Sequence, residues 1–191
     1  MILAKIRALW NDRSGVAAIE FAILAPLMIL TFVGVVEVSH ALTVSRKVTA
    51  ATYNVANLLS RYEEVADSDI QDIFTVAESN MVPYDTSNLA VRLTLVHIDE
   101  DGTTVVGWSD AKNMDPLDQD AAFVLPDGIG EPGGSVVFAE TSYDHETITR
   151  PGDLIFGGST TLSDAAYVRP RLTPRVVRIS GDGGGGGDGG E

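Results

Sequence analysis

The chain contains no cysteine among its 191 residues, so disulfide bonds and thiolate metal sites are excluded. It has three histidines, and none stands in the pattern of a serine, cysteine or zinc hydrolase. Basic residues are also scarce, because 13 Lys and Arg stand against 27 Asp and Glu, a net charge of −14. Such a chain offers no basic face to phosphates, so we expect no nucleic acid partner. We therefore expect a structural or binding protein, not an enzyme, with no cofactor and no metal.

Charge is missing altogether from one long stretch, Phe21 to Val36. With the apolar residues 16–19 added, the stretch is long enough to cross a bilayer: as a helix, Val16 to Val36 would extend about 31 Å. An α-helix also satisfies its backbone hydrogen bonds internally, as lipid requires. Pro26 lies inside the stretch and predicts a kink, which membrane helices tolerate. We predict a transmembrane helix over residues 16–38.

A carboxylate lies near the start of this helix. Glu20 costs on the order of 3 kcal/mol in a membrane helix, and such residues usually mark a function or a partner. The alternative is that Glu20 lies among the lipid headgroups and stays hydrated. Upstream is a short leader that ends in Gly15, and its bases are Lys5, Arg7 and Arg13. The chain thus has, in order, a basic leader, a glycine, four apolar residues, Glu20 and Phe21. This order resembles a type IV prepilin-like signal.

The segment RSGVAAIEFAILAPL, residues 13–27, resembles the N-terminal signature of the TadE-like family. This family comprises minor pseudopilins of the tight-adherence (Tad/Flp) pilus system, and the resemblance is specific over residues 13–60. It implies that a prepilin peptidase cleaves between Gly15 and Val16. It also implies that other pseudopilins or pilus assembly proteins are partners.

The same resemblance implies that Glu20, followed by Phe21, is the assembly residue. Cleavage would give Val16 a free α-amine, and Glu20 lies one helical turn further along. The carboxylate could then face the amine of its own chain or of a neighbouring subunit. Neither charge would be buried alone, which would cost far more.

The basic leader indicates a cytoplasmic N-terminus, with the rest of the chain exported across the bacterial inner membrane into the periplasm. Two alternatives remain open. The chain could be an uncleaved, membrane-tethered periplasmic accessory or binding module. The helix could also be a secretory signal peptide, cut after Ala41 in Ser39-His40-Ala41.

Hydrophobic periodicity predicts an α+β, pilin-like fold with a small, mostly antiparallel sheet. A three- and four-residue spacing continues the membrane helix to Tyr62, through Leu42, Val48, Ala51, Val55, Leu58 and Leu59. A short second helix follows, with Ile70, Ile73, Phe74 and Ala77 on its apolar face. Strands are predicted at residues 89–99, 103–108, 135–147, 160–168 and 176–179, with a hairpin turn at Asp101-Gly102.

The chain is therefore expected to divide into five segments. They are a basic cytoplasmic leader (1–15), a transmembrane helix (16–38), an amphipathic helix with a short second helix (39–80), an extracytoplasmic β-rich domain (81–180) and a disordered glycine-rich tail (181–191).

Other polar residues have local explanations. Asp67 or Ser68 is expected to cap the second helix. Glu37 is expected at the exit of the membrane helix, in the interface, on one face with His40. In the polar segment 110–120, Asp115, Asp118 and Asp120 have oxygen ligands at a spacing that suits Ca²⁺, but the EF-hand glycine and closing Glu are missing. A solvated loop is the favoured interpretation there.

Overall fold

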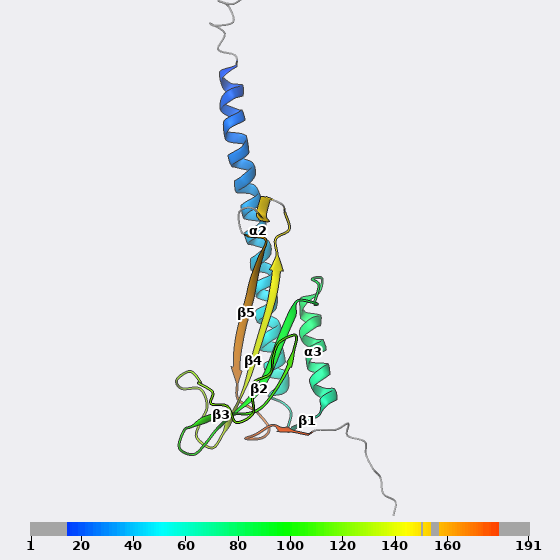
Figure 1. Cartoon of the computed structure of the whole chain (residues 1–191), viewed down its shortest axis with the longest axis vertical. Coiled ribbons are helices and arrows are strands. Elements are labelled where there is room, and N and C mark those ends of the chain that lie inside the picture. Colours follow the sequence, from blue (N-terminus) through cyan, green and yellow to red (C-terminus); the bar gives the residue numbers. More distant parts are fainter. Residues whose placement is uncertain (1–14, 150, 154–156, 180–191) are drawn as a thin grey trace, which may run out of the picture. The chain divides into compact units, whose positions relative to one another are not determined.

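The computed structural model describes residues 15–149, 151–153 and 157–179. The predicted cytoplasmic leader before Gly15 and the predicted glycine-rich tail lie outside these residues. The named elements follow one another along the chain in the order α2, β1, α3, β2, β3, β4, β5 and β6, and residues 151–153 are also helical (Figure 1). The chain divides into two compact units, one formed by Met1–Ala41 with Glu146–Ser159 and the other by Leu42–His145 with Thr160–Glu191.

Helix α2 (Val16–Leu59) is a single helix of 44 residues. At the usual rise per residue it is about 66 Å long. Among the described residues, it is the one helix long and apolar enough to cross a membrane, and no part of its most apolar stretch is buried. The prediction that an apolar helix continues directly into an amphipathic one is confirmed.

The C-terminal part of α2 contributes one side of the hydrophobic core of the second unit. Val44, Val48, Val55 and Leu59 are fully or almost fully buried there. The prediction that Leu42 belongs to this apolar face is wrong, because its side chain is 53% exposed. Val44 lies one turn before Val48 and shares its face, whereas Leu42 lies six residues before Val48 and points elsewhere.

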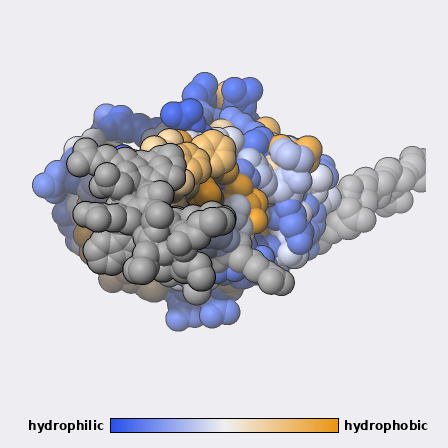
Figure 2. Space-filling model, turned by 90° about the horizontal axis from the view of Figure 1, so that it is seen from above, coloured by the Kyte–Doolittle hydropathy of each residue, from blue (hydrophilic) through white to orange (hydrophobic). Residues whose placement is uncertain are grey.

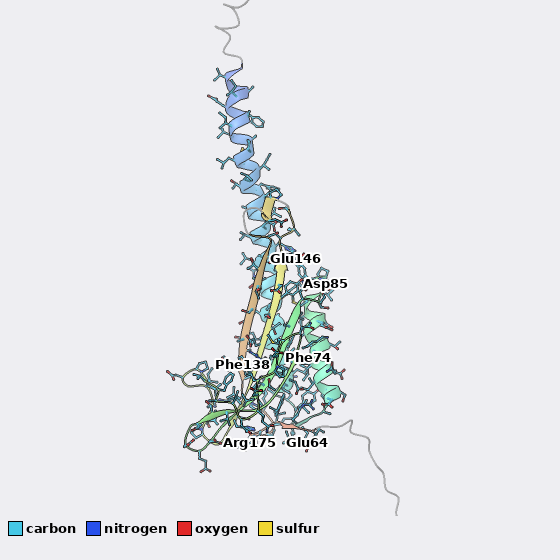
Figure 3. All side chains as sticks on the ribbon, in the orientation of Figure 1. Glu64, Phe74, Asp85, Phe138, Glu146 and Arg175 are labelled. Carbon is cyan, nitrogen blue, oxygen red and sulfur yellow. The ribbon has the colours of Figure 1, made fainter. Side chains whose placement is uncertain are left out.

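Helix α3 (Asp67–Met81) buries the four apolar residues that its spacing predicted, and Phe74 is labelled in Figure 3. The predicted cap is wrong in detail. The helix begins after Ala66, whose N–H donates to the Asp69 carboxylate at 2.8 Å. A side chain at the third helical position often reaches back in this way. Asp67 instead pairs with Arg178.

The main sheet has the strand order β3-β2-β4-β5. Strand β2 (Leu89–Ile98) lies between β3 (Thr104–Lys112) and β4 (Ser135–Glu146) and is antiparallel to both, while β5 (Ser159–Val168) forms the other edge. The predicted turn is confirmed: Gly102 has a φ of +87°, and Asp99 N–H donates to the Thr103 carbonyl at 2.8 Å. A glycine adopts this φ without strain. An α+β fold with a mostly antiparallel sheet is therefore confirmed.

Strand β3 continues four residues beyond the predicted end at Trp108, into the segment expected to be loop. The register pairs Lys112 with Val91, so β3 runs almost the whole length of its neighbour β2. Ser109 also meets Thr94 across the pair, with the two hydroxyl oxygens 2.8 Å apart. Pairing along β2 thus outweighs the polar composition of this segment.

Two very short strands form a second sheet. β1 (Glu64–Val65) and β6 (Val177–Arg178) pair in parallel, apart from the main sheet. We predicted the last strand near this position but not its partner. The indole N–H of Trp108 donates to the Val176 carbonyl at 3.0 Å. This hydrogen bond and the ion pairs of Arg178 with Asp67 and Asp110 hold β6 in place.

Aromatic side chains pack beside strand β4. The ring centroids of Phe138 and Phe123 are 5.0 Å apart, and those of Phe138 and Tyr167 are 5.1 Å apart. These spacings are typical of favourable aromatic pairs. Most of the coloured surface visible in Figure 2 is hydrophilic, as the high content of acidic residues leads us to expect.

Candidate functional site

The predicted cleavage site coincides with the start of α2. Gly15 lies in a turn, Val16 is the first helical residue, and Ile19 N–H donates to the Gly15 carbonyl at 3.1 Å. Apart from Gly15 and its two chain neighbours, no atom lies within 4 Å of the position that a Cβ of Gly15 would take. Helix ends fray more readily than helix interiors. The Gly15–Val16 peptide bond lies at the N-terminal end of α2, next to a turn.

Glu20 lies on the exposed surface of the first turns of α2. It is four residues from Val16, so both project from the same side of the helix. Its carboxylate has no hydrogen bond or ion pair to any residue in the described ranges. The neighbouring Phe21 is 67% exposed. A partner for Glu20 has to come from outside this part of the chain.

The N-terminal part of α2 is apolar all the way round. Its exposed large hydrophobic residues include Ile19, Ile23, Leu24, Leu27, Met28, Ile29, Leu30, Phe32 and Val35. A helix that is hydrophobic on every side requires an apolar environment on every side. The hydroxyls within it bond to its own backbone, Thr31 to the Leu27 carbonyl at 2.8 Å and Ser39 to the Val35 carbonyl at 2.7 Å. This surface suits lipid or the packed helices of an assembly.

Pro26 lies inside α2, which is helical on both sides of it. Proline has no N–H, so the carbonyl of Ala22 loses its usual helical donor. The helix therefore continues in spite of this gap in its hydrogen bonds. The kink expected at this residue stays a prediction.

Glu37 is the carboxylate whose surroundings the sequence did not reveal. Its side chain is only 3% exposed. One carboxylate oxygen accepts hydrogen bonds from the Thr149 N–H at 2.8 Å and the Thr149 hydroxyl at 2.7 Å. The other accepts from the Ile148 N–H at 3.1 Å. Glu37 thus binds the connection between β4 and β5 instead of lying open in an interface.

A glycine completes this arrangement. A Cβ on Gly152 would lie 2.4 Å from a carboxylate oxygen of Glu37, so only glycine fits there without a shift. The Gly152 N–H donates to the Thr149 hydroxyl at 3.0 Å. We call Glu37, Ile148, Thr149 and Gly152 the Glu37 site. The one sequence signal for the Glu37 site was a charged residue at the end of an apolar helix. Such a residue predicts a partner but does not say where in the chain the partner lies.

The three aspartates considered for Ca²⁺ do not form a cation site. Among the residues that the structure describes, no group of three or more His, Asp and Glu side chains gathers closely enough to hold a metal ion. The Asp115 carbonyl accepts from Arg92 at 3.2 Å, and the Asp120 N–H donates to the Val106 carbonyl at 2.8 Å. These backbone contacts anchor the segment to the sheet.

A cavity of about 380 Å³ lies beside β3 and β6. It is lined by His97, Gly107, Trp108, Gln119 and residues 175–178, and Arg175 is labelled in Figure 3. Burial and then the positive charge of Arg175 lower the pKa of His97, against the opposing effect of Asp99 and Asp120. The described residues of the lining include no Ser, Thr, Cys or carboxylate. The cavity therefore offers a histidine without a nucleophile or an acid to act with.

These observations define an α+β protein whose long apolar helix is consistent with a single-pass membrane anchor. A family model described as TadE-like protein matches residues 15–57, from the turn at Gly15 almost to the end of α2. The resemblance to the TadE-like family is confirmed over this segment, and it indicates a protein associated with the Tad pilus and its components. No curated protein and no solved structure matches the chain.

Proposed function

We propose that this protein is a pseudopilin-like structural and assembly protein of a Tad-type pilus, and not an enzyme. Helix α2 anchors it in the bacterial inner membrane, with a cytoplasmic N-terminus and a periplasmic α+β domain. A prepilin peptidase cleaves between Gly15 and Val16, and other pseudopilins or assembly proteins are its partners. The observation that supports this most is the exposed Glu20, one turn after the helix start and without a partner in the described chain.

The physical argument concerns the pairing of two charges. A lone carboxylate in a membrane helix costs on the order of 3 kcal/mol. Cleavage would create a positive amine on Val16, one helical turn from Glu20. The positive end of the helix dipole adds to the attraction. Pairing within one chain or between neighbouring chains would lower the cost of keeping both groups in an apolar environment.

The first experiment determines the N-terminus of the protein purified from its native membrane. A chain that begins at Val16 supports processing and the pseudopilin role. An intact Met1 contradicts processing and favours the uncleaved accessory module. A chain that begins at Leu42 means that the apolar helix is a signal peptide, which contradicts the membrane anchor as well.

Matched glycine variants test the cleavage position. In Gly15→Leu, we expect the leader to be retained. Gly34→Leu is the control, because a Cβ at Gly34 also meets no atom within 4 Å and the position lies well inside α2. Equal processing of both variants would contradict the role of Gly15.

The role of Glu20 is tested separately from cleavage. We expect Glu20→Gln to leave membrane insertion intact and to reduce the amount of assembled pilus, because the amine of Val16 loses its counter-charge. Glu146→Gln removes the same charge from an exposed position at the end of β4 and serves as control (Figure 3). Wild-type pilus output from the Glu20 variant would refute the assembly role.

A further inference from the structure

The segment that binds Glu37 also presents an apolar side chain to its surroundings. Ile148 is 54% exposed, although its own N–H is fixed to the buried Glu37 carboxylate. Its neighbour Thr149 uses both its N–H and its hydroxyl on the same carboxylate. The backbone at this position is thus held by hydrogen bonds, while about half of the isoleucine is exposed.

The position of Glu37 along α2 sets the level at which Ile148 lies. Glu37 directly follows Val36, the last residue of the uncharged stretch. The stretch from Val16 to Val36 extends about 31 Å, close to the thickness of the hydrocarbon core of a bilayer. A hydrogen bond of 3.1 Å joins the Ile148 backbone to Glu37. If α2 spans the membrane, Ile148 lies within a side chain's length of the boundary between hydrocarbon and headgroups.

We propose that Ile148 enters the lipid headgroup region, and that the Glu37 site holds it at this depth as a second membrane contact beside α2. The bilayer boundary accommodates this arrangement, because it accepts apolar side chains while leaving the adjacent backbone in a polar environment. The buried carboxylate accepts hydrogen bonds there from three donors of the β4–β5 connection. The inference rests on the membrane anchor of the proposed function.

Two other features of the structure are consistent with this contact. Val38, the next residue of α2, is also about half exposed, so apolar surface continues beyond Glu37. A hydrogen bond joins the two ends of the β4–β5 connection, because the Thr147 N–H donates to the Gly158 carbonyl at 3.0 Å. The backbone of Ile148 is thereby fixed from two sides and can present its side chain at a constant depth.

The absence of cysteine makes a direct test possible, because any introduced cysteine is unique. The full-length protein would be labelled with an NBD fluorophore at one site and reconstituted in phosphatidylcholine and phosphatidylglycerol vesicles. The three sites are Ile148→Cys, Leu30→Cys inside the apolar stretch, and Val124→Cys, which is 89% exposed in the other unit. Lipids spin-labelled at the headgroup or deep in the acyl chain act as quenchers.

We expect headgroup-labelled lipid to quench NBD at residue 148, deep-labelled lipid to quench it at residue 30, and neither to quench it at residue 124. Without deep quenching at residue 30, both the membrane anchor and this inference are wrong. If residue 30 is quenched while residue 148 behaves like residue 124, only this inference is wrong. A blue-shifted but unquenched label at residue 148 would mean contact with a second copy, and also overturns it.

A second pair of variants tests whether the Glu37 site sets the depth. Glu37→Gln, made in the Ile148→Cys protein, is expected to lose quenching by headgroup-labelled lipid. Glu146→Gln is the control, since it removes a nearby charge that has no hydrogen-bond partner in the described residues. Unchanged quenching in the Glu37 variant would show that the site does not hold Ile148 at the membrane.

Discussion

The Glu37→Gln substitution tests the buried carboxylate with a side chain of almost the same shape. In the wild type, one oxygen accepts two hydrogen bonds from Thr149 and the other accepts one from Ile148. Glutamine has one acceptor oxygen, which we expect to take the position facing Thr149, since two donors point there. The amide NH₂ would then face the Ile148 N–H, donor against donor.

The magnitude follows from the loss of this hydrogen bond. A hydrogen bond to a charged group contributes about 1.5–3 kcal/mol, and the Ile148 N–H would lose its carboxylate acceptor. We therefore expect the free energy of local opening to fall by about 2 kcal/mol. At 1.36 kcal/mol per factor of ten, this corresponds to about 30-fold faster amide hydrogen exchange at Ile148.

Hydrogen exchange of the full-length protein in nanodiscs, read by mass spectrometry on peptides that contain Ile148 and Thr149, provides the measurement. The expected change is confined to these peptides, because the rest of the core keeps its contacts. Glu146→Gln serves as the charge-matched control and should exchange like the wild type. An unchanged rate in Glu37→Gln would refute the reasoning that the carboxylate holds this segment.

Three further predictions concern the rest of the molecule. Gly152→Ala should speed hydrogen exchange at Ile148 and Thr149, because its Cβ would lie 2.4 Å from a carboxylate oxygen of Glu37. Gly34→Ala is the control, since a Cβ there has open space around it. Equal exchange rates in the two variants would contradict this prediction. Trp108→Phe removes the indole donor to the chain before β6 and should lower the free energy of unfolding in urea by about 1 kcal/mol; an unchanged midpoint would refute it. The pKa of His97 is lowered from 6.5 in the folded state, so on acidification the unfolded chain takes up the proton at a higher pH than the folded chain does. Unfolding titrations should therefore show the free energy of unfolding falling as the pH drops below 6.5. His97→Gln should weaken this pH dependence, and an identical pH profile would contradict the assignment.

Several elements followed from the sequence because their signals are local. The apolar face of α3 has the helical period, and all four residues predicted for it are buried. The turn at Gly102 required a residue that tolerates positive φ. The family signature around Gly15 and Glu20 is likewise a matter of spacing along one helix, and the family match begins at Gly15.

Other elements depended on contacts between distant segments. Strand β3 extends to Lys112 because β2 offers a partner for each added residue. The pairing of β1 with β6 joins segments that lie far apart in the chain, and each strand has only two residues. The last strand was expected at residues 176–179, but two residues of β1 have no period to detect, so neither β1 nor its pairing with β6 was predicted.

The sequence by itself determined the long apolar helix, the class of fold and the arrangement of Gly15, Val16 and Glu20, because hydrophobicity and helical spacing act over a few residues. Tertiary structure alone decided that Glu37 is buried against Ile148 and Thr149, 111 and 112 positions away. A carboxylate in an apolar helix requires hydrogen-bond donors, and this requirement can be predicted from the sequence. Which donors meet it is fixed only when the folded chain brings the β4–β5 connection to that helix.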